Sequence, residues 1–534
     1  MYKKKEIIIP SLITAILLSA SLIAGRSLEQ ASDFSLITSS KLTTLKNFSL
    51  YTILSYIIFY TVYYCISRIH IKRSRDYFFP GFLILWLVIF LCWIPCYLAY
   101  YPGTFTYDVG WQTEQALGMV KYDNWHPVLH TYFLSICIKI SKLIGGTDNT
   151  SLIIYSISQM LIVSALFASV LSYMQKIGVH IIIKVLSFAY FALFPFNAVL
   201  SFNVTKDVIF AGIFVLFTVF ILDLTRSPGV FLNSKKTTIK FFFVALLLCL
   251  FRHNGIYIMI LLFPCALILM WQYRKQISFA FLSPIFAFLI ITNLLFPVLQ
   301  ISPGPVQEKL SVLMHQLALV ARNHDNELSD EEKATIYRYI QEDAPKIYNP
   351  RWTESTKNLN GGFKSDAYVI DPHGFKDIWF TLLKRYPQDY IISFLTSHLS
   401  YWDPGVKFVD CYYLNKYILT HINDYDFFKI ERKSVFPKLL VKYERATEIR
   451  DFDNILVRFL YSTATPIWVV FCSIMICLIK NNKRLILGLL PSFFLWLTIM
   501  ASPAELVRLI YPLMISYPLY FTVIFQSNLF KTPS

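Results

Sequence analysis

Charged side chains are scarce in this chain of 534 residues. Only 15% of its residues are charged, whereas soluble globular chains usually carry about 25%. The stretches Phe78–Leu98 and Phe279–Leu299 contain no charged residue at all. Each is about 20 residues long, which is enough for a helix to cross the roughly 30 Å hydrocarbon layer of a bilayer. The composition therefore argues against an ordinary soluble protein and predicts an integral membrane protein.

Three other features are also missing. Alternating strand patterns are absent, so helices are expected to satisfy the backbone in lipid. Of the 9 cysteines, most lie in apolar runs and only Cys411 falls in the large polar segment, which argues against a disulfide framework. The net charge of +16 is gathered in clusters beside apolar runs, the pattern of cytoplasmic loops, and forms no basic stripe with interleaved aromatics. We therefore expect a lipid bilayer as partner and no nucleic acid.

The N-terminal segment imitates a secretory signal. Lys3, Lys4 and Lys5 precede an apolar run, Ile7–Ala24. No small-x-small cleavage site closes this run before Gly25 and Arg26. The segment is therefore predicted to be an uncleaved anchor whose lysines lie in the cytoplasm.

The basic clusters fix a topology in which cytoplasmic loops carry the excess of lysine and arginine. This pattern predicts about twelve spans with both termini cytoplasmic. The predicted spans are Ile7–Ala24, Phe48–Ser67, Phe78–Tyr100, Leu152–Leu171, Ile181–Leu200, Val208–Leu222, Phe241–Phe251, Ile256–Trp271, Phe279–Leu299, Ile455–Ile479, Leu485–Met500 and Leu506–Phe525.

The stretch Val128–Ile144 is ambiguous. Its apolar residues repeat at helical spacing, but it is short and carries His130, Lys139 and Lys142. We interpret it as an interfacial helix on the outer surface. The alternative is a true span, which would invert the topology of everything that follows and place the basic loop 226–240 outside.

The sequence divides into four parts under this topology. Residues 1–77 hold two N-terminal spans, and residues 78–300 form a membrane module whose outer loops carry acidic residues. Residues 301–454 are polar and punctuated by proline and glycine, which predicts a mainly helical extracytoplasmic domain. Ser329-Asp330-Glu331-Glu332 is a capping box that predicts a helix over Asp330–Glu342. Residues 455–534 hold the last three spans.

Five polar motifs lie at the outer ends of the predicted spans. They are Tyr101-Pro102-Gly103-Thr104-Phe105-Thr106-Tyr107-Asp108 with Gln112 and Glu114, Asn124-Trp125-His126-Pro127, Thr205-Lys206-Asp207, Arg252-His253-Asn254-Gly255, and Glu505-Leu506-Val507-Arg508-Leu509-Ile510-Tyr511. Any one of them has an ordinary explanation as a snorkelling side chain or a helix cap. Charged residues at span ends are costly, and five such motifs on one face indicate a functional site.

These motifs contain the groups that sugar transfer from a lipid phosphate requires. Asp108 follows a Pro-Gly turn directly outside a span, where a carboxylate can accept a proton from an attacking hydroxyl. Lys206, Arg252 and Arg508 supply cations, and arginine offers a fork that fits phosphate oxygens. Trp111, Trp125 and Tyr107 either pack against sugar faces or serve as interfacial belt anchors.

A metal site is suggested by one spacing only. His126 and His130 stand at i and i+4, a spacing that can hold a divalent metal ion. No third ligand lies in register with them. The sequence therefore leaves the identity of a cofactor open, with a divalent metal ion as the one candidate.

The order of these motifs resembles an uncharacterised family of bacterial polytopic membrane proteins that is grouped with the GT-C superfamily of membrane glycosyltransferases. The resemblance runs from about Phe78 to the last span. It rests on Tyr101-Pro102-Gly103, Asp108, Gln112, His126-Pro127, Lys206-Asp207, Arg252-His253-Asn254-Gly255, Arg508 and Tyr511. Superfamily members carry a catalytic acid in the first outer loop and another acid in the second, which match Asp108 and Asp207 here.

The resemblance implies an inverting transfer of a sugar from a polyprenyl-phosphate donor to a cell-envelope glycan, teichoic polymer or lipid at a bacterial plasma membrane. Asp108 would be the general base, and Asp207 would position a cation or a base partner. Lys206, Arg252 and Arg508 would hold the donor phosphate. The other expected substrate-binding residues are Gln112, His126, His253, Gln316 and Tyr511. The chain lacks the Asp-Glu pair of protein mannosyltransferases and the Trp-Trp-Asp motif of oligosaccharyltransferases, so neither of those substrates is implied.

Further expectations discriminate this function from its rivals. Asp108, Arg252 and Arg508 should meet in one outward-facing cavity, and the extracytoplasmic domain should cover that cavity. His315, Gln316, Trp352, Tyr401 and Trp402 are its candidates for an acceptor groove, or else core residues. A transporter or lipid flippase would instead place polar groups near the bilayer midplane. A non-catalytic envelope-assembly protein would leave the outer loops without convergent charge.

Overall fold

The computed structural model describes residues 4–69, 71, 79–106, 108–358, 362–406, 426–447 and 455–530. Tyr107 and Cys411, and the basic run at 72–75, lie outside the described residues. The described chain is overwhelmingly helical, and its strands, β1 (Thr104–Phe105) and β2 (Asn203–Val204), have two residues each. The expected all-α architecture is confirmed at this level.

Seven helices in the described residues are long and apolar enough to cross a membrane. They are α1 (Lys4–Ala31), α3 (Lys41–Arg68), α4 (Phe82–Ala99), α7 (Asp148–Ile177), α10 (Lys206–Arg226), the helical stretch Trp271–Val298 and the stretch Val507–Phe530, which contains α29 (Val507–Met514) and α30 (Tyr517–Gln526). The pair α8 (Ile181–Leu193) and α9 (Pro195–Phe202) adds an eighth if its 48° bend lies within one span.

Four of the twelve predicted spans correspond to shorter helices. They are α12 (Lys235–Phe251), α13 (Asn254–Leu269), α25 (Ile455–Tyr461) with α26 (Thr465–Ile479), and α27 (Lys483–Ile486) with α28 (Leu490–Ile499). Proline contributes to the breaks, because Pro466 and Pro491 stand in the first turns of α26 and α28. The count of twelve stays a prediction.

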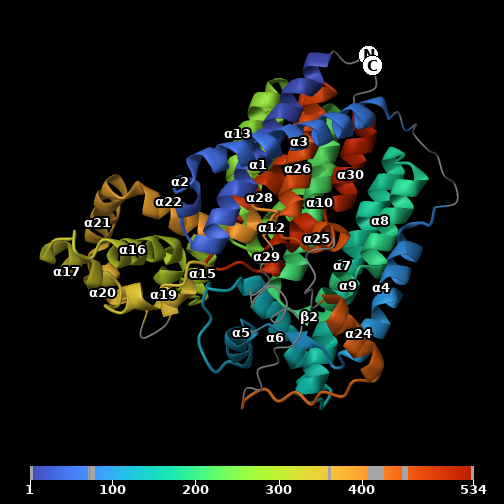
Figure 1. The fold of residues 1–534 in the computed structure, drawn as a ribbon. Helices are drawn as coiled ribbons and strands as arrows, with labels where there is room; N and C mark the ends of the chain where they lie inside the picture. The colour runs from blue at the N-terminus through green and yellow to red at the C-terminus, as the bar shows by residue number, and fades with distance from the viewer. Residues whose placement is uncertain are drawn as a thin grey trace.

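The bundle is built around α10 and α29–α30. Almost every side chain of α10 is buried, and α10 packs against α7, α12 and α29. By contrast, α3 runs along the outside of the bundle against α1, and most of its apolar side chains are exposed (Figure 1). An exposed apolar helix of this length is suited to contact with lipid tails.

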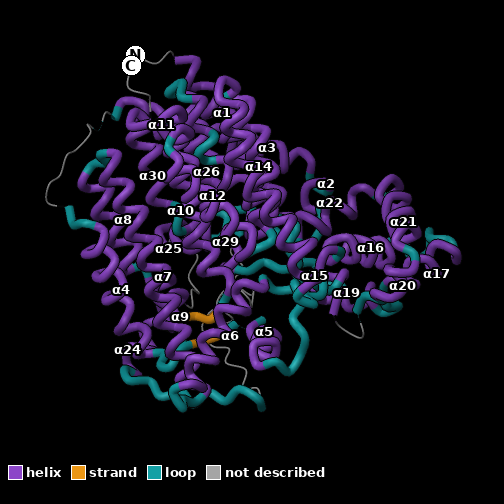
Figure 2. The backbone as a smooth tube through the Cα atoms, turned by 180° about the vertical axis from the view of Figure 1, so that it is seen from behind, coloured by secondary structure: helices purple, strands orange, loops and turns teal. Residues whose placement is uncertain are grey.

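A second group of helices extends to one side of the bundle (Figures 1 and 2) and has a hydrophobic core of its own. It is formed by α16 (Ser311–Asn323), α17 (Asp330–Tyr339), α20 (Ser365–Ile370), α21 (Pro372–Arg385) and α22 (Pro387–Thr396). The predicted capping box is confirmed, because Ser329 Oγ accepts from the Glu332 N–H at 3.2 Å and Glu332 Oε2 accepts from the Ser329 N–H at 3.0 Å. The helix ends at Tyr339, earlier than predicted.

The predicted 301–454 domain does not form one body throughout its described part. Within this range the second core draws on residues 306–406, to which Leu28 of α1 and Phe34 are added, whereas α24 (Pro437–Thr447) packs against α4 and α9 of the bundle. Two short helices lie between α4 and α7 in the chain. They are α5 (Val109–Leu117) and α6 (Val128–Leu143), which pack against each other, and α6 also packs against α7. With 16 residues, α6 is shorter than the seven helices that could cross a membrane. Its placement at the interface stays a prediction.

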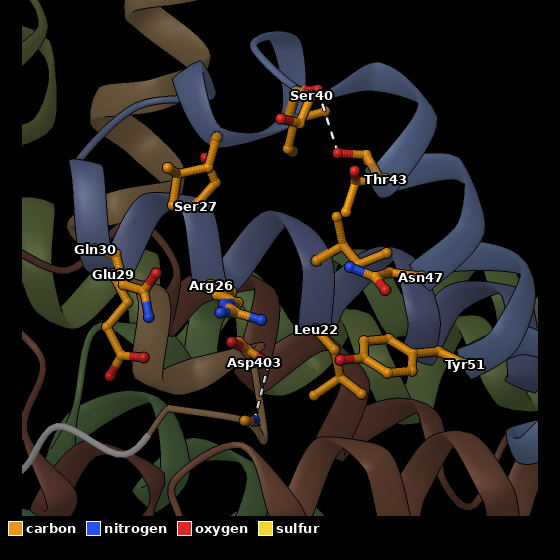
Figure 3. Close-up of a pocket in the computed structure, with 15 residues that line it drawn as sticks. Leu22, Arg26, Ser27, Glu29, Gln30, Ser40, Thr43, Asn47, Tyr51 and Asp403 are labelled. Atoms are coloured by element: carbon orange, nitrogen blue, oxygen red, sulfur yellow. Dashed lines mark hydrogen bonds between the residues drawn. The ribbon is translucent and has the colours of Figure 1, made fainter.

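A cavity of about 660 Å³ lies between α1, α2 (Ser35–Thr38) and α3, beside the end of the second core (Figure 3). Its lining mixes apolar residues with Arg26, Glu29 and Asp403. Asp403 is 2% exposed and its Oδ1 accepts from the Gly405 N–H at 2.9 Å. Asp403 also lies against Gly25, where an added Cβ would come within 1.8 Å of Asp403 Oδ2. Gly25 thus lets α1 approach the second domain closely.

Candidate active site

A two-residue ladder brings the first and third polar motifs together. β1 and β2 pair in parallel, with Thr104 opposite Asn203 and Phe105 opposite Val204. Asp108 and Lys206 follow these strands in the chain. Because the strands are parallel, both residues lie beyond the same end of the pair. As a result Lys206 Nζ lies 3.0 Å from Asp108 Oδ2.

Asp207 occupies the first turn of α10. Thr205 is the N-cap residue, and its Oγ1 accepts from the Asp207 N–H at 3.4 Å and lies 3.1 Å from Asp207 Oδ2. A carboxylate is favoured at a helix N-terminus by the unsatisfied N–H groups and the helix dipole. Asp207 is completely buried, so its charge requires a cation close by.

The Arg252-His253-Asn254-Gly255 motif supplies that cation. It forms the sharp turn between α12 and α13. Arg252 Nη1 donates to Asp207 Oδ1, and its Nε donates to Asn254 Oδ1 at 2.8 Å. An added Cβ at Gly255 would meet the Leu248 carbonyl oxygen at 2.3 Å, so only glycine fits this turn. His253 Nε2 lies 3.1 Å from the Asn124 carbonyl oxygen and donates to it.

Arg508 joins the two acids. It stands in the first turn of α29 and is 7% exposed. Its Nη1 lies 2.9 Å from Asp108 Oδ2, and its Nε lies 3.5 Å from Asp207 Oδ2. The expectation that Asp108, Arg252 and Arg508 meet in one cavity is therefore confirmed, whereas their chemical roles stay predictions.

The cluster carries an excess of one positive charge. Lys206, Arg252 and Arg508 face two carboxylates, those of Asp108 and Asp207. Burial alone would raise the pKa of the Asp108 carboxyl, but the Arg508 and Lys206 charges outweigh it and hold that pKa well below its usual range. Asp108 is therefore ionised at any physiological pH.

His126 adds a neutral partner to this cluster. Its Nδ1 accepts from Lys206 Nζ at 2.9 Å. Burial, followed by the positive charge of Lys206, lowers the pKa of His126 well below its usual range. The imidazole is therefore neutral, and it orients the lysine without adding charge.

These residues line a cavity of about 750 Å³. The bundle contributes Asp108, Trp111, Trp125, His126, Lys206, Asp207, Arg252, His253, Tyr257 and Arg508 among others. Trp111 and Trp125 lie with their ring centroids 6.2 Å apart, so two aromatic side chains share one part of the wall. Such a mixture of aromatic faces and convergent charges is typical of a ligand site.

The second domain also contributes to the lining, with Glu308, Lys309, Glu354 and Lys357. Lys357 Nζ lies 3.0 Å from both carboxylate oxygens of Glu308 and 3.3 Å from Glu354 Oε1. Sequence reasoning missed all four residues. Glutamate and lysine in a polar segment are most often solvated surface residues, so the pattern gives no signal by itself.

Glu505 fixes the second domain over the cavity. This carboxylate is fully buried, and it accepts from Arg351 Nη2 at 2.5 Å and from the Ser400 N–H at 2.5 Å. Tyr401 Oη accepts from the Leu506 N–H at 2.5 Å across the same boundary. The expected coverage of the cavity by this domain is thus confirmed. Tyr401, proposed for an acceptor groove, instead belongs to the joint between the two cores.

Three predicted substrate-binding residues do not reach the cavity. Gln112 is buried between α5 and α6, where its Nε2 donates to Thr131 Oγ1 at 2.9 Å. Tyr511 Oη donates to Asn197 Oδ1 at 2.9 Å inside the bundle. Both follow their functional neighbours by about one helical turn, so the sequence alone could not separate them from residues that face the site.

Gln316 is the third of these residues, and it lies in the second core. Its Nε2 donates to the Tyr390 carbonyl oxygen at 3.2 Å, and its Oε1 accepts from Trp379 Nε1 at 3.2 Å. The neighbouring His315 is also completely buried and stacks on Tyr348. Both side chains hold the domain together and line no part of the cavity.

The donor set does not fit a divalent metal ion. Among the described residues, no group of three or more His, Cys, Asp or Glu side chains could hold one. His130 contacts Gln112 Oε1 at 3.1 Å and Tyr155 Oη at 2.7 Å, so both its ring nitrogens are occupied away from His126. Asp108 and Asp207 are engaged by the three cations.

One comparison with known proteins is informative. A model for a family of unknown function, DUF6020, matches residues 119–529, which is most of the chain. The chain belongs to the DUF6020 family. The DUF6020 match spans Lys206, Asp207, Arg252, Glu354 and Arg508 and begins after Asp108. No curated protein and no solved structure matches the chain.

Proposed function

We propose that this DUF6020 protein is a GT-C-like glycosyltransferase that moves a sugar from a polyprenyl-phosphate donor to an extracytoplasmic acceptor of the cell envelope. The observation that carries the proposal is the convergence of Lys206, Arg252 and Arg508 with two carboxylates on one cavity. A polyprenyl-phosphate sugar is a phosphodiester with one negative charge. The single excess positive charge of the cluster matches it.

The chemistry follows from where charge develops. Departure of the phosphate from the anomeric carbon adds negative charge to the leaving oxygen, and fixed cations in a partly dry cavity stabilise that charge. Arg508 and Arg252 offer planar forks to phosphate oxygens, and Lys206 offers a point charge. Asp207 keeps both arginines in place. Trp111 and Trp125 are positioned to pack against a sugar ring.

The proposal includes the topology on which an extracytoplasmic reaction depends. The protein would be a multi-pass protein of a bacterial plasma membrane with twelve spans and both termini cytoplasmic. In support, α1 begins and α30 ends at the same end of the bundle, whereas α5, which carries Trp111 of the cavity lining, lies toward the other end (Figure 1). The basic loop at 226–240 and the cavity would then face opposite sides.

Two rival functions explain the geometry less well. An envelope-assembly protein would have no need for Arg508 within 2.9 Å of Asp108 and for a second ion pair between Arg252 and Asp207. A lipid flippase would need polar groups along a path across the bilayer. In the described structure the ion pairs of Asp108 and Asp207 lie in one cavity, to which the second domain also contributes.

Binding of polyprenyl phosphate tests the proposed phosphate site. Purified protein should bind a polyprenyl phosphate in detergent with an affinity that falls when Arg252 is replaced by alanine. Arg385→Ala is the matched control, because Arg385 pairs with Glu332 on the surface of the second domain. Equal affinities of the two variants and the unmodified protein would contradict the proposed phosphate site.

A further inference from the structure

Two carboxylates from different parts of the fold line the same cavity in contrasting surroundings. Asp108 comes from the bundle and Glu354 from α19 (Glu354–Asn358) of the second domain. A site that holds two carboxylates in different environments commonly gives them different tasks, because the environment sets which of them exchanges a proton near neutral pH.

Asp108 is poorly suited to accept a proton. Its Oδ2 is contacted by both Lys206 Nζ and Arg508 Nη1, at 3.0 and 2.9 Å. Protonation would remove the carboxylate charge that both cations contact in a nearly buried position, and Arg508 would then keep only its longer contact with Asp207. A carboxylate whose pKa is held far below its usual range is a weak base, and proton transfer to it has little driving force.

Glu354 has the opposite character. Its side chain is 18% exposed, and Lys357, its one ion-pair partner among the described residues, is shared with Glu308. The lysine sits nearer to Glu308, touching both of its oxygens at 3.0 Å, while it reaches only Oε1 of Glu354 at 3.3 Å. Burial raises the pKa of Glu354, and the positive charge of Lys357 offsets this increase only in part. The negative charges of Glu308 and Asp108 raise the pKa further.

We propose that Glu354 is the general base that accepts the proton of the acceptor hydroxyl, and that Asp108 is a positioning residue that holds Lys206 and Arg508 for the donor phosphate. This inference rests on the proposed glycosyl transfer. It places the acceptor between the second domain and the sugar, and the donor phosphate against the bundle. The second domain is then part of the catalytic machinery.

The step balances without any further reactant. The acceptor oxygen forms a bond to the anomeric carbon as its proton moves to a Glu354 carboxylate oxygen. The bond between the anomeric carbon and the phosphate oxygen breaks, and its electron pair stays on that oxygen, so polyprenyl phosphate leaves as the dianion. Glu354 then returns its proton to solvent through the mouth of the cavity.

The test separates proton removal from departure of the phosphate. Azide is an anion and attacks without losing a proton, so it requires no base. With a polyprenyl-phosphate sugar as donor, Glu354→Gln should lower transfer to a hydroxyl acceptor about a hundredfold or more. The same variant should form the glycosyl azide, with release of polyprenyl phosphate, at nearly the rate of the unmodified protein. Asp108→Asn should lower both reactions together, because it disturbs the phosphate site.

The pH profile gives a second readout that a merely structural role would not move. Transfer to the hydroxyl should rise as pH passes upward through the pKa of the base, and Glu354→Gln should abolish this rise. Asp108→Asn should keep the rise but shift it to lower pH, because it removes a negative charge that raises the pKa of Glu354. Glu354→Asp should keep the rise at a lower rate, which shows that the fold survives substitution.

The outcomes are distinct. If Glu354→Gln keeps both the hydroxyl transfer and the pH-dependent rise, and Asp108→Asn loses the rise, then Asp108 is the base and the inference is overturned. If the unmodified protein releases polyprenyl phosphate from no sugar donor, with azide or with a hydroxyl, the proposed function fails and this inference fails with it. Loss of hydroxyl transfer with retained azide transfer in Glu354→Gln establishes the inference.

Discussion

Arg508 Nη1 lies 2.9 Å from Asp108 Oδ2, although the two residues are 400 positions apart in the chain. The same arginine reaches Asp207 through its Nε at 3.5 Å. One side chain thus holds together three segments: the loop after β1, the start of α10 and the start of α29. Because both acids and the arginine are buried or nearly so, their arrangement is rigidly defined before any ligand binds.

Arg508→Ala should weaken the binding of polyprenyl phosphate by about tenfold to a hundredfold, since a hydrogen bond to a charged group contributes roughly 1.5–3 kcal/mol. Arg508→Lys should recover part of the affinity, because lysine keeps the charge but cannot span both acids. Affinity measured by displacement of a fluorescent lipid phosphate checks this. Equal binding by Arg508→Ala and the unmodified protein would exclude Arg508 from the phosphate site.

Gly255→Ala should destabilise the protein by about 1–3 kcal/mol, the usual cost of forcing atoms into a packed site. An added Cβ would meet the Leu248 carbonyl oxygen at 2.3 Å, so the turn that carries Arg252 would have to open. Gly81→Ala is the matched control, because nothing lies within 4 Å of a Cβ there. Thermal unfolding in detergent should show a lower Tm for Gly255→Ala alone. A similar Tm for both variants would contradict the tight turn.

Asp403→Asn should raise the Tm above that of the unmodified protein at pH 8. Burial raises the pKa of Asp403 from near 4 in the unfolded chain to about 7 in the folded protein. The folded state therefore loses stability as the pH rises from about 4 to about 7. The penalty is complete above pH 7 and reaches at most about 4 kcal/mol. Asparagine avoids it, so the difference in Tm should vanish near pH 4. A difference that does not depend on pH would show that Asp403 is not buried as described.

Cysteine labelling should reach position 370 from outside intact cells and position 230 only after the membrane is opened. Ile370, in the second domain, is 84% exposed, and Val230, in the predicted cytoplasmic loop, is 76% exposed. Labelling at each position therefore depends on which side of the membrane it faces and not on burial. Replacement of Cys65, the exposed native cysteine among the described residues, lowers the background. Labelling of both positions from the same side would refute the predicted topology.

Much of the helical architecture was predictable, because uncharged runs and capping residues act locally. The span that became α10 and the capping box at Ser329 are examples. The predicted spans failed to form single long helices where proline interrupts them, as at Pro466 and Pro491. Hydropathy averages over a window, so it does not register where a helix ends within an apolar run.

The site was predictable in part. The polar motifs identified Asp108, Lys206, Asp207, Arg252 and Arg508 because charges at the ends of apolar runs are unusual. The β1–β2 ladder that aligns the first and third motifs depends on a pairing between distant segments and has no sequence signature. Glu354 and Lys357 were missed for the same reason, since only the docking of the second domain through Glu505 brings them to the cavity.

A glycosyltransferase of this kind must release polyprenyl phosphate from its sugar donor. Purified protein would be incubated with a panel of polyprenyl-phosphate sugars and a hydroxyl acceptor, and the freed lipid phosphate would be quantified. The proposed function predicts release from at least one donor, a loss of about two orders of magnitude or more in Arg508→Ala, which removes charge stabilisation of the leaving phosphate, and little change in Arg385→Ala. Absence of release from every donor, or equal release by Arg508→Ala and the unmodified protein, would contradict it.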